Sequence, residues 1–163
     1  MRTKDRRVVV MGVAGSGKSA VGEVLAIAVG ARFVDADSLH PDANVAKMSA
    51  GVPLTDDDRW PWLERVRDEL AGDAPIVVAC SALRRRYRDV LRSAGGVRFV
   101  LLDVDQRTAT ERATHREGHF MGAGMVASQF EALESPAGDE PDVLVVDASP
   151  PIDRVVATVV AAL

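Results

Sequence analysis

The residues best suited to chemistry lie in a glycine-rich segment near the N-terminus. The segment matches the pattern G-x-x-x-x-G-K-[ST], in which successive backbone N–H groups close around phosphate oxygens. Glycines allow this because they have no Cβ, and a helix that follows adds unpaired N–H groups and a partial positive charge. In this pattern the lysine contacts the β- and γ-phosphates and the final hydroxyl binds Mg²⁺. The sequence therefore predicts a site for a nucleoside triphosphate and Mg²⁺ formed by Gly12, Ala14, Gly15, Ser16, Gly17, Lys18 and Ser19.

Two carboxylates are placed to complete the chemistry of such a site. Asp35 and Asp37 follow a short apolar run, whereas the later run Pro75–Cys80 has no acid at its end. Side chains at the carboxyl ends of parallel strands reach the crevice in which α/β proteins bind ligands. We assign Asp35 to the metal, directly or through water, and Asp37 to the proton of an acceptor hydroxyl. The spacing alone leaves a second interpretation open, in which Asp37 and Ser38 cap the next helix.

Alternating apolar runs and helical segments are expected to position these groups. Continuously apolar runs are typical of strands buried on both faces of a parallel sheet. The predicted strands are Val8–Val13, Arg32–Asp35, Pro75–Cys80, Val97–Asp103 and Asp142–Asp147. The predicted helices are Ser19–Val29, Arg59–Leu70, Leu83–Ser93 (capped by Ser81) and Ile152–Leu163. This alternation predicts one three-layer α/β domain over residues 1–163. Residues 36–58 and 114–141 do not fit it and are predicted to be irregular functional insertions.

Composition excludes several classes of protein. The net charge is −4 and aromatic residues make up 4% of the chain, which argues against a nucleic-acid partner. No apolar run approaches the 18 residues that a membrane helix needs. The single cysteine, Cys80, permits no internal disulfide and fits a reducing compartment. We therefore expect a cytoplasmic location without a membrane partner.

Blocks of residues along nearly the whole chain resemble the gluconate kinase family, a branch of the P-loop kinases similar in architecture to shikimate and nucleoside monophosphate kinases. The blocks include Asp35-Ala36-Asp37-Ser38-Leu39-His40-Pro41, Pro53-Leu54-Thr55-Asp56-Asp57-Asp58-Arg59, Cys80-Ser81-Ala82-Leu83-Arg84, Gly118-His119-Phe120-Met121 and Ser128-Gln129-Phe130. The resemblance implies a P-loop NTPase fold with a five-stranded parallel sheet in the order 2-3-1-4-5, helices on both faces and a mobile lid at about 112–135. It also implies ATP, Mg²⁺, transfer to the 6-hydroxyl of D-gluconate, and a homodimer.

Gluconate is a carboxylate with a chain of hydroxyls, so a selective site needs a cation and several polar partners. Arg59 and Arg84 are candidates for the carboxylate, because a guanidinium group can bind it through two parallel hydrogen bonds. His40, Asn44 and Lys47 follow the Asp pair and are candidates for the hydroxyls. For Arg59 and Lys47 the alternative is a solvated surface charge.

The lid region supplies the remaining candidates. The resemblance places Arg116 at the transferring phosphoryl group as a catalytic residue, and Arg112 over the adenine. His119 is assigned to substrate or lid contact, with a purely structural role as the alternative. Gln129 is expected to bind substrate or to hold the closed lid.

Two other functions compete with this interpretation. A related P-loop kinase could act on another acceptor such as shikimate, but such relatives lack the block from His40 to Trp62. A nucleotide-dependent regulator would keep the phosphate loop, but it would not need an acceptor site of the kind that Asp37, Arg59 and Arg84 indicate.

Overall fold

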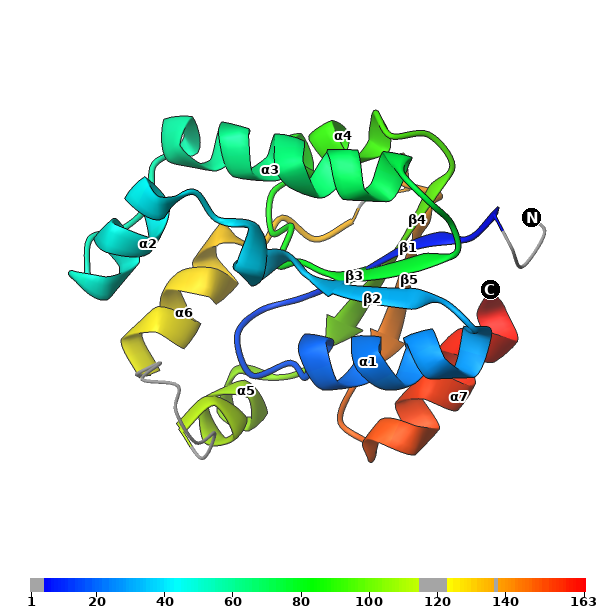
Figure 1. Cartoon of the computed structure of the whole chain (residues 1–163). Helices are drawn as coiled ribbons and strands as arrows, with labels where there is room; N and C mark the ends of the chain where they lie inside the picture. The colour runs from blue at the N-terminus through cyan, green and yellow to red at the C-terminus, as the bar shows by residue number, and fades with distance from the viewer. Residues whose placement is uncertain (1–4, 115–122, 137) are drawn as a thin grey trace.

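Five strands form one parallel sheet in the computed structural model, which describes residues 5–114, 123–136 and 138–163. The strands are β1 (Arg7–Met11), β2 (Arg32–Asp35), β3 (Ile76–Ala79), β4 (Val97–Asp103) and β5 (Val143–Asp147). Their order is β2-β3-β1-β4-β5, and all four neighbouring pairs are parallel. The predicted order 2-3-1-4-5 is confirmed, and every predicted strand lies within two residues of its observed bounds (Figure 1).

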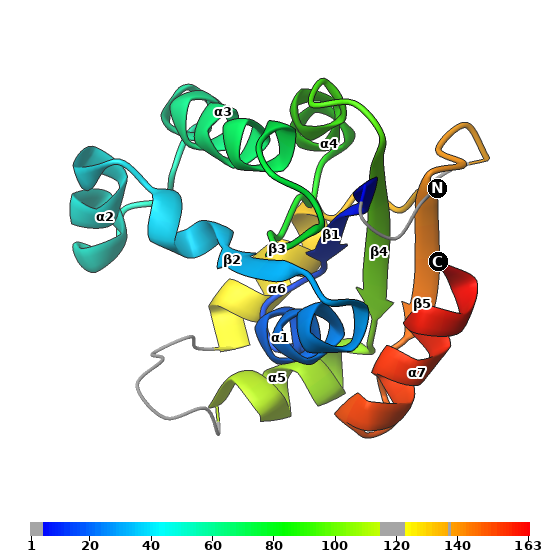
Figure 2. The same cartoon turned by 45° about the vertical axis from the view of Figure 1, so that its right-hand side comes forward.

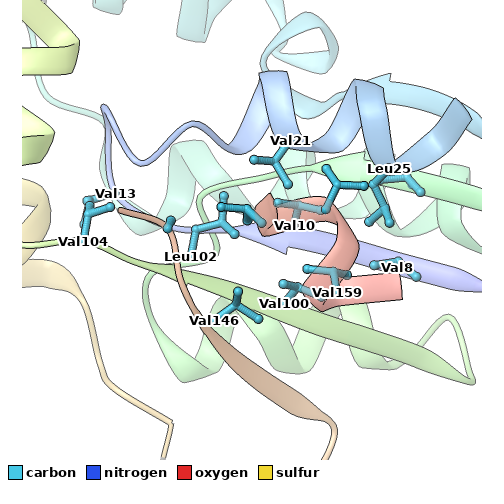
Figure 3. Packing of buried hydrophobic residues seen from close by; sticks show 14 of the residues in the cluster. Val8, Val10, Val13, Val21, Leu25, Val100, Leu102, Val104, Val146 and Val159 are labelled. Carbon is cyan, nitrogen blue, oxygen red and sulfur yellow. The ribbon is translucent and has the colours of Figure 1, made fainter. Parts of the chain in front are cut away.

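The apolar runs form strands because both faces of the sheet are covered. Val8 and Val10 of the central strand belong to one buried cluster, which includes α1 (Lys18–Val29) and α7 (Ile152–Ala162). Val9 and Met11 belong to the other, which includes α3 (Asp56–Ala71) and α4 (Arg85–Arg92). Figure 3 shows the first cluster, in which strand valines meet α1 and α7. Since successive strand residues point to opposite faces, uninterrupted hydrophobicity follows directly from the three layers.

The segment 36–58 is mostly helical, contrary to the prediction of an irregular insertion. It contains the 3₁₀ turn η2 (Ala36–Leu39), the helix α2 (Asp42–Ser49) and the first turn of α3. The predicted start of α3 at Arg59 is wrong by three residues, because Thr55 and Asp58 form a reciprocal capping box. Figure 2 shows α2 projecting from the body of the sheet beyond α3.

Two further predictions are corrected. The segment 114–141 contains the helix α6 (Ala123–Ala132), which follows an unpredicted helix α5 (Gln106–Thr114). The predicted cap at Ser81 is wrong, since α4 begins at Arg85 with Arg84 as its N-cap residue. Residues 80–84 instead form a connection in which Ala82 has φ of 45°, a left-handed conformation unusual for a residue with a side chain.

The topology brings the carboxyl ends of β1, β2 and β3 to one edge of the sheet. The glycine-rich segment follows β1, Asp35 ends β2, and residues 80–84 follow β3. Among the described residues no helix is long and apolar enough to cross a membrane.

Candidate active site

The phosphate loop connects β1 to α1 and packs tightly on α5. At Gly15, where φ is 81°, a Cβ would lie 2.1 Å from the carbonyl oxygen of Ala109. Only glycine fits there, so the loop is held close to α5. The Ser16 hydroxyl is buried and has no hydrogen-bond partner among the described residues. An orphaned buried donor inside such a loop fits an anion as its missing partner.

A pocket of about 180 Å³ adjoins this loop and is lined by Gly15, Gly17, Ala20 and Arg112. Arg112 is fixed at its edge because Nη1 donates to the carbonyl oxygen of Ala148 at 2.9 Å. The pocket thus joins the phosphate loop to the arginine predicted to cover the adenine. Its lining of glycines and one arginine suits an anion such as a nucleotide phosphate.

Ser19 and Asp35 are brought together as the metal prediction requires. The Ser19 hydroxyl donates to Oδ2 of Asp35 at 3.1 Å, and Oδ1 of Asp35 accepts the Asp37 backbone N–H at 3.0 Å. Mg²⁺ in such enzymes takes one or two protein oxygens and completes its shell with waters and phosphate oxygens. Within residues 5–114, 123–136 and 138–163 no group of three or more His, Cys, Asp or Glu side chains could hold a metal ion. One hydroxyl and one carboxylate fit Mg²⁺ that is carried in with a nucleotide.

Asp37 is exposed, and its carboxylate makes no hydrogen bond among the described residues. The cap of η2 is Asp35, not Asp37, and the Ser38 hydroxyl donates to the Asp35 carbonyl oxygen at 2.7 Å. The alternative in which Asp37 and Ser38 form a helix cap is therefore wrong. Asp37 is left available to an acceptor hydroxyl, and that role stays a prediction.

His40 lies flat against Trp62, with ring centroids 4.2 Å apart. Its pKa is lowered mainly by burial, with a further contribution from Arg59, while Asp37 opposes the shift. The neutral form of the ring therefore predominates at pH 7. Nδ1 lies 3.1 Å from Nδ2 of Asn44, which can only donate, so the ring proton is on Nε2 and can be donated to a ligand.

Asn44 and Lys47 have partners within the protein. Nδ2 of Asn44, which is buried, donates to the Asp58 carbonyl oxygen at 2.9 Å, and Nζ of Lys47 donates to Oδ2 of Asp58 at 2.7 Å. The Lys47 hydrogen bond is the main reason that the pKa of Asp58 is lowered to about 2. These contacts fasten α2 to the start of α3; binding of substrate hydroxyls by Asn44 and Lys47 stays a prediction.

Arg59 is held in place by groups that sequence reasoning missed. Its guanidinium group lies 5.4 Å from the centre of the Tyr87 ring, and Nη1 is 3.5 Å from Oδ1 of Asp56. Tyr87 in turn donates its hydroxyl to Oδ1 of Asp56 at 2.5 Å. Arg86 donates to the same carboxylate at 2.7 Å. The side chain of Arg59 is therefore positioned by α4, the helix whose N-cap residue is Arg84.

Arg84 is half-buried at the N-cap position of α4, and its side chain has no hydrogen-bond or ion-pair partner among the described residues. Residues 80–84, the connection that leads to Arg84, are supported by the fully buried side chain of Arg88. Nη1 of Arg88 donates to the carbonyl oxygens of Ala82 and Leu83 at 3.0 and 3.2 Å. Its other nitrogens form a bidentate pair with Glu140, at 2.8 Å each. Arg88 thus holds the left-handed Ala82 backbone and leaves Arg84 available to an anion.

The remaining candidates are the three residues of the predicted lid region. Arg116 and His119 lie outside the described residues, so their assigned roles stay predictions. Gln129 lies on α6, and its Oε1 accepts the backbone N–H of Ala14 at 2.6 Å. It therefore contacts the nucleotide side of the site.

This fold, with a phosphate loop and a Ser–Asp pair at the carboxyl edge of a parallel sheet, defines a P-loop kinase of small molecules. The shikimate kinase family model matches residues 14–161. The thermoresistant gluconokinase of Escherichia coli is 43% identical over 93% of this chain and 90% of its own length. The gluconokinase of Gluconobacter oxydans is 45% identical over 86% and 82%.

Solved structures of gluconokinases and shikimate kinases have the same fold as this chain. The crystal structure of a gluconokinase from Sinorhizobium meliloti superposes with a TM-score of 0.89, at 47% identity over 98% of this chain and 92% of that one. A shikimate kinase from Aquifex aeolicus gives 0.63 at 17% identity over 96% of this chain and 95% of that one, and so shares the fold. The chain belongs to the gluconokinase family, within the broader shikimate kinase group.

Proposed function

We propose that the protein is a gluconokinase, which transfers the γ-phosphoryl group of ATP to the 6-hydroxyl of D-gluconate. One observation supports this most directly: the Ser19–Asp35 pair lies at the same sheet edge as Asp37 and the loop that presents Arg84. This arrangement supports a nucleotide site and an acceptor site for an anionic polyol at the same end of the sheet. The relatives named gluconokinases support the choice of acceptor.

On the nucleotide side, the N–H groups of the loop and the start of α1 would bind the phosphates, and Lys18 would bind the β- and γ-phosphate oxygens. Ser19 and Asp35 would hold Mg²⁺, which neutralises charge on the phosphates when bound. Arg112 would cover the base. By resemblance, Arg116 would stabilise the charge that develops on the transferring group.

On the acceptor side, Arg59 and Arg84 would bind the carboxylate of gluconate, and Nε2 of the neutral His40 would donate to a hydroxyl. Asn44, Lys47 and His119 are further hydroxyl candidates. Asp37 would orient the 6-hydroxyl and accept its proton late, because the loose transition state of phosphoryl transfer asks little of a strong base. The Asp37 carboxylate is exposed and accepts no hydrogen bond from a described residue, which suits that task.

Product identification tests the proposal. Purified protein is incubated with ATP, Mg²⁺ and one acceptor from a panel of D-gluconate, other sugar acids and shikimate, and the product is identified by ³¹P and ¹³C NMR. We expect 6-phosphogluconate from D-gluconate and slow turnover of the rest. A different preferred acceptor would contradict the proposed substrate, and ADP release that no acceptor stimulates would favour a nucleotide-dependent regulator.

The resemblance also supports a homodimer that acts in the cytoplasm, and we propose both. Light scattering of the purified protein gives the mass in solution. A mass near the 17.4 kDa of one chain would contradict the dimer.

A further inference from the structure

One peptide group of the phosphate loop is held from outside the loop. The carbonyl oxygen of Val13 accepts the Ser16 N–H at 3.1 Å, and the Ala14 N–H of the same peptide group donates to Oε1 of Gln129 at 2.6 Å. Because both ends of this peptide plane are hydrogen-bonded, its rotation is fixed. The inner contact belongs to the loop, and the outer contact comes from a residue 115 positions further along the chain.

The helix that carries Gln129 is firmly seated at this point. Val126, three residues earlier, is fully buried in the same cluster as Val13 and Ala14. Phe130 and Leu133 also pack against that cluster. The Gln129 side chain therefore projects from a supported part of α6, which makes it suitable as a fixed point for the loop.

The end of α6 is fastened in turn to the acceptor side. The Glu134 N–H donates to the Leu83 carbonyl oxygen at 2.7 Å, and the Glu134 carbonyl oxygen accepts from Nη2 of Arg88 at 2.9 Å. Residues 129–134 thus connect the phosphate loop to the connection that carries Arg84.

We propose that Gln129 is a positioning residue for the nucleotide: it holds the Val13–Ala14 peptide group so that the loop is already shaped for phosphate before ATP binds. A loop ordered in advance loses less conformational entropy on binding, and so binds more tightly. The role differs from substrate binding, for which Gln129 would have to direct its amide toward the acceptor. The proposal rests on the phosphate loop as the ATP site, but not on the identity of the acceptor.

Gln129→Met is the informative variant, because methionine keeps the length and helix preference of glutamine but cannot replace its carbonyl oxygen as acceptor. Glu131→Gln, at an exposed position of the same helix, is the matched control. Each variant is titrated with MgADP by calorimetry, followed by steady-state kinetics in both substrates and thermal unfolding.

We expect Gln129→Met to weaken MgADP binding roughly 3- to 10-fold, the effect of one lost hydrogen bond, and to raise the KM for ATP similarly. In Gln129→Met the KM for gluconate at saturating ATP should stay within about twofold of wild type, because the lost hydrogen bond is made to the phosphate loop. Glu131→Gln should match wild type in MgADP affinity, in both KM values and in Tm.

Three outcomes would overturn the proposal. A raised KM for gluconate with unchanged MgADP affinity would make Gln129 an acceptor-binding residue. A lower Tm with unchanged affinity for both ligands would make it purely structural, and no change in any quantity would leave it without a role. The MgADP titration needs no acceptor, so it still tests Gln129 if the wild-type protein fails to phosphorylate gluconate.

Discussion

The hydroxyl of Ser19 and the carboxylate of Asp35 are hydrogen-bonded across 3.1 Å, although Ser19 lies in the first turn of α1 and Asp35 ends the edge strand β2. Between them they offer two oxygens to a cation that arrives with phosphate. The remaining carboxylate oxygen caps η2, so Asp35 has both a chemical and a structural task.

Asp35→Asn should therefore weaken the metal interaction while it preserves the fold, because asparagine can still accept the Asp37 N–H. We expect the Mg²⁺ concentration for half-maximal activity to rise about 10-fold or more. Activity measured against Mg²⁺ at fixed ATP checks this. An unchanged Mg²⁺ dependence would remove Asp35 from the metal site.

Asp37→Asn should impair phosphoryl transfer and leave nucleotide binding intact. MgADP affinity should stay close to wild type, while kcat falls about 100-fold or more, within the range that general acid–base groups contribute. Asp42→Asn, at an exposed position in the first turn of α2, is the control. A collapse of nucleotide affinity in Asp37→Asn would mean that the roles of Asp35 and Asp37 are reversed.

Lys18→Ala should lower kcat about 100-fold or more, because a charge that stabilises the transferring phosphoryl group is lost. Circular dichroism should be unchanged. Near-normal turnover would refute the role of Lys18 at the phosphates.

Arg88→Met should cost about 3 kcal/mol of unfolding free energy, the lower end of the range for breaking a buried ion pair, because Arg92 still donates to Glu140 at 2.6 Å. Denaturant unfolding measures this. Arg85→Ala, which removes an exposed pair with Asp139, should change stability little. Equal losses in the two variants would contradict the importance of the buried network.

The buried pair of Arg88 and Glu140 also predicts that the stability of the fold depends on pH. The pKa of Glu140 is lowered from its ordinary value of 4.5 to about 2, chiefly by the hydrogen bond from Arg88. A depressed carboxyl pKa stabilises the fold fully above about pH 4.5, and this contribution is lost as the pH falls from 4.5 toward 2. The stability difference between wild type and Arg88→Met should therefore shrink over that window. A constant difference would show that Glu140 is not the group concerned.

Cys80 should be inert in the native protein. It is buried at the end of β3, and burial raises the pKa of its thiol to about 12. We expect no labelling by a thiol reagent at pH 8 and one label per chain after unfolding. Rapid native labelling would show that the loop after β3 opens.

Much of the fold could be predicted because its signals are local. Strands buried on both faces are continuously apolar, so the run that contains β3, which is buried at every position, can be recognised in the sequence. The helix α2 has no such signal, because Val45 and Met48 are exposed and its buried residue is the polar Asn44. The start of α3 could have been found, since Thr55 and Asp58 have capping-box spacing.

The site was predictable where a residue type and its position along a strand or loop determine its role, as for Ser19 and Asp35. It was not predictable where contacts join distant segments. Arg88 belongs to a run of arginines that includes exposed members, and its acidic partner is 52 residues away. Likewise nothing near Ala14 in the sequence indicates that Gln129 binds its N–H.

The Arg88 network has a consequence for the order in which the chain acquires its shape. A growing chain that has reached β3 and α4 already contains Arg84 and the left-handed turn at Ala82, but not the carboxylate that neutralises Arg88. Until Glu134 and Glu140 emerge and dock, burying that guanidinium group would leave an unpaired charge in an apolar interior. The connection that carries Arg84 must therefore take its final shape only after Glu140 has docked, as a long-range and comparatively slow step of folding.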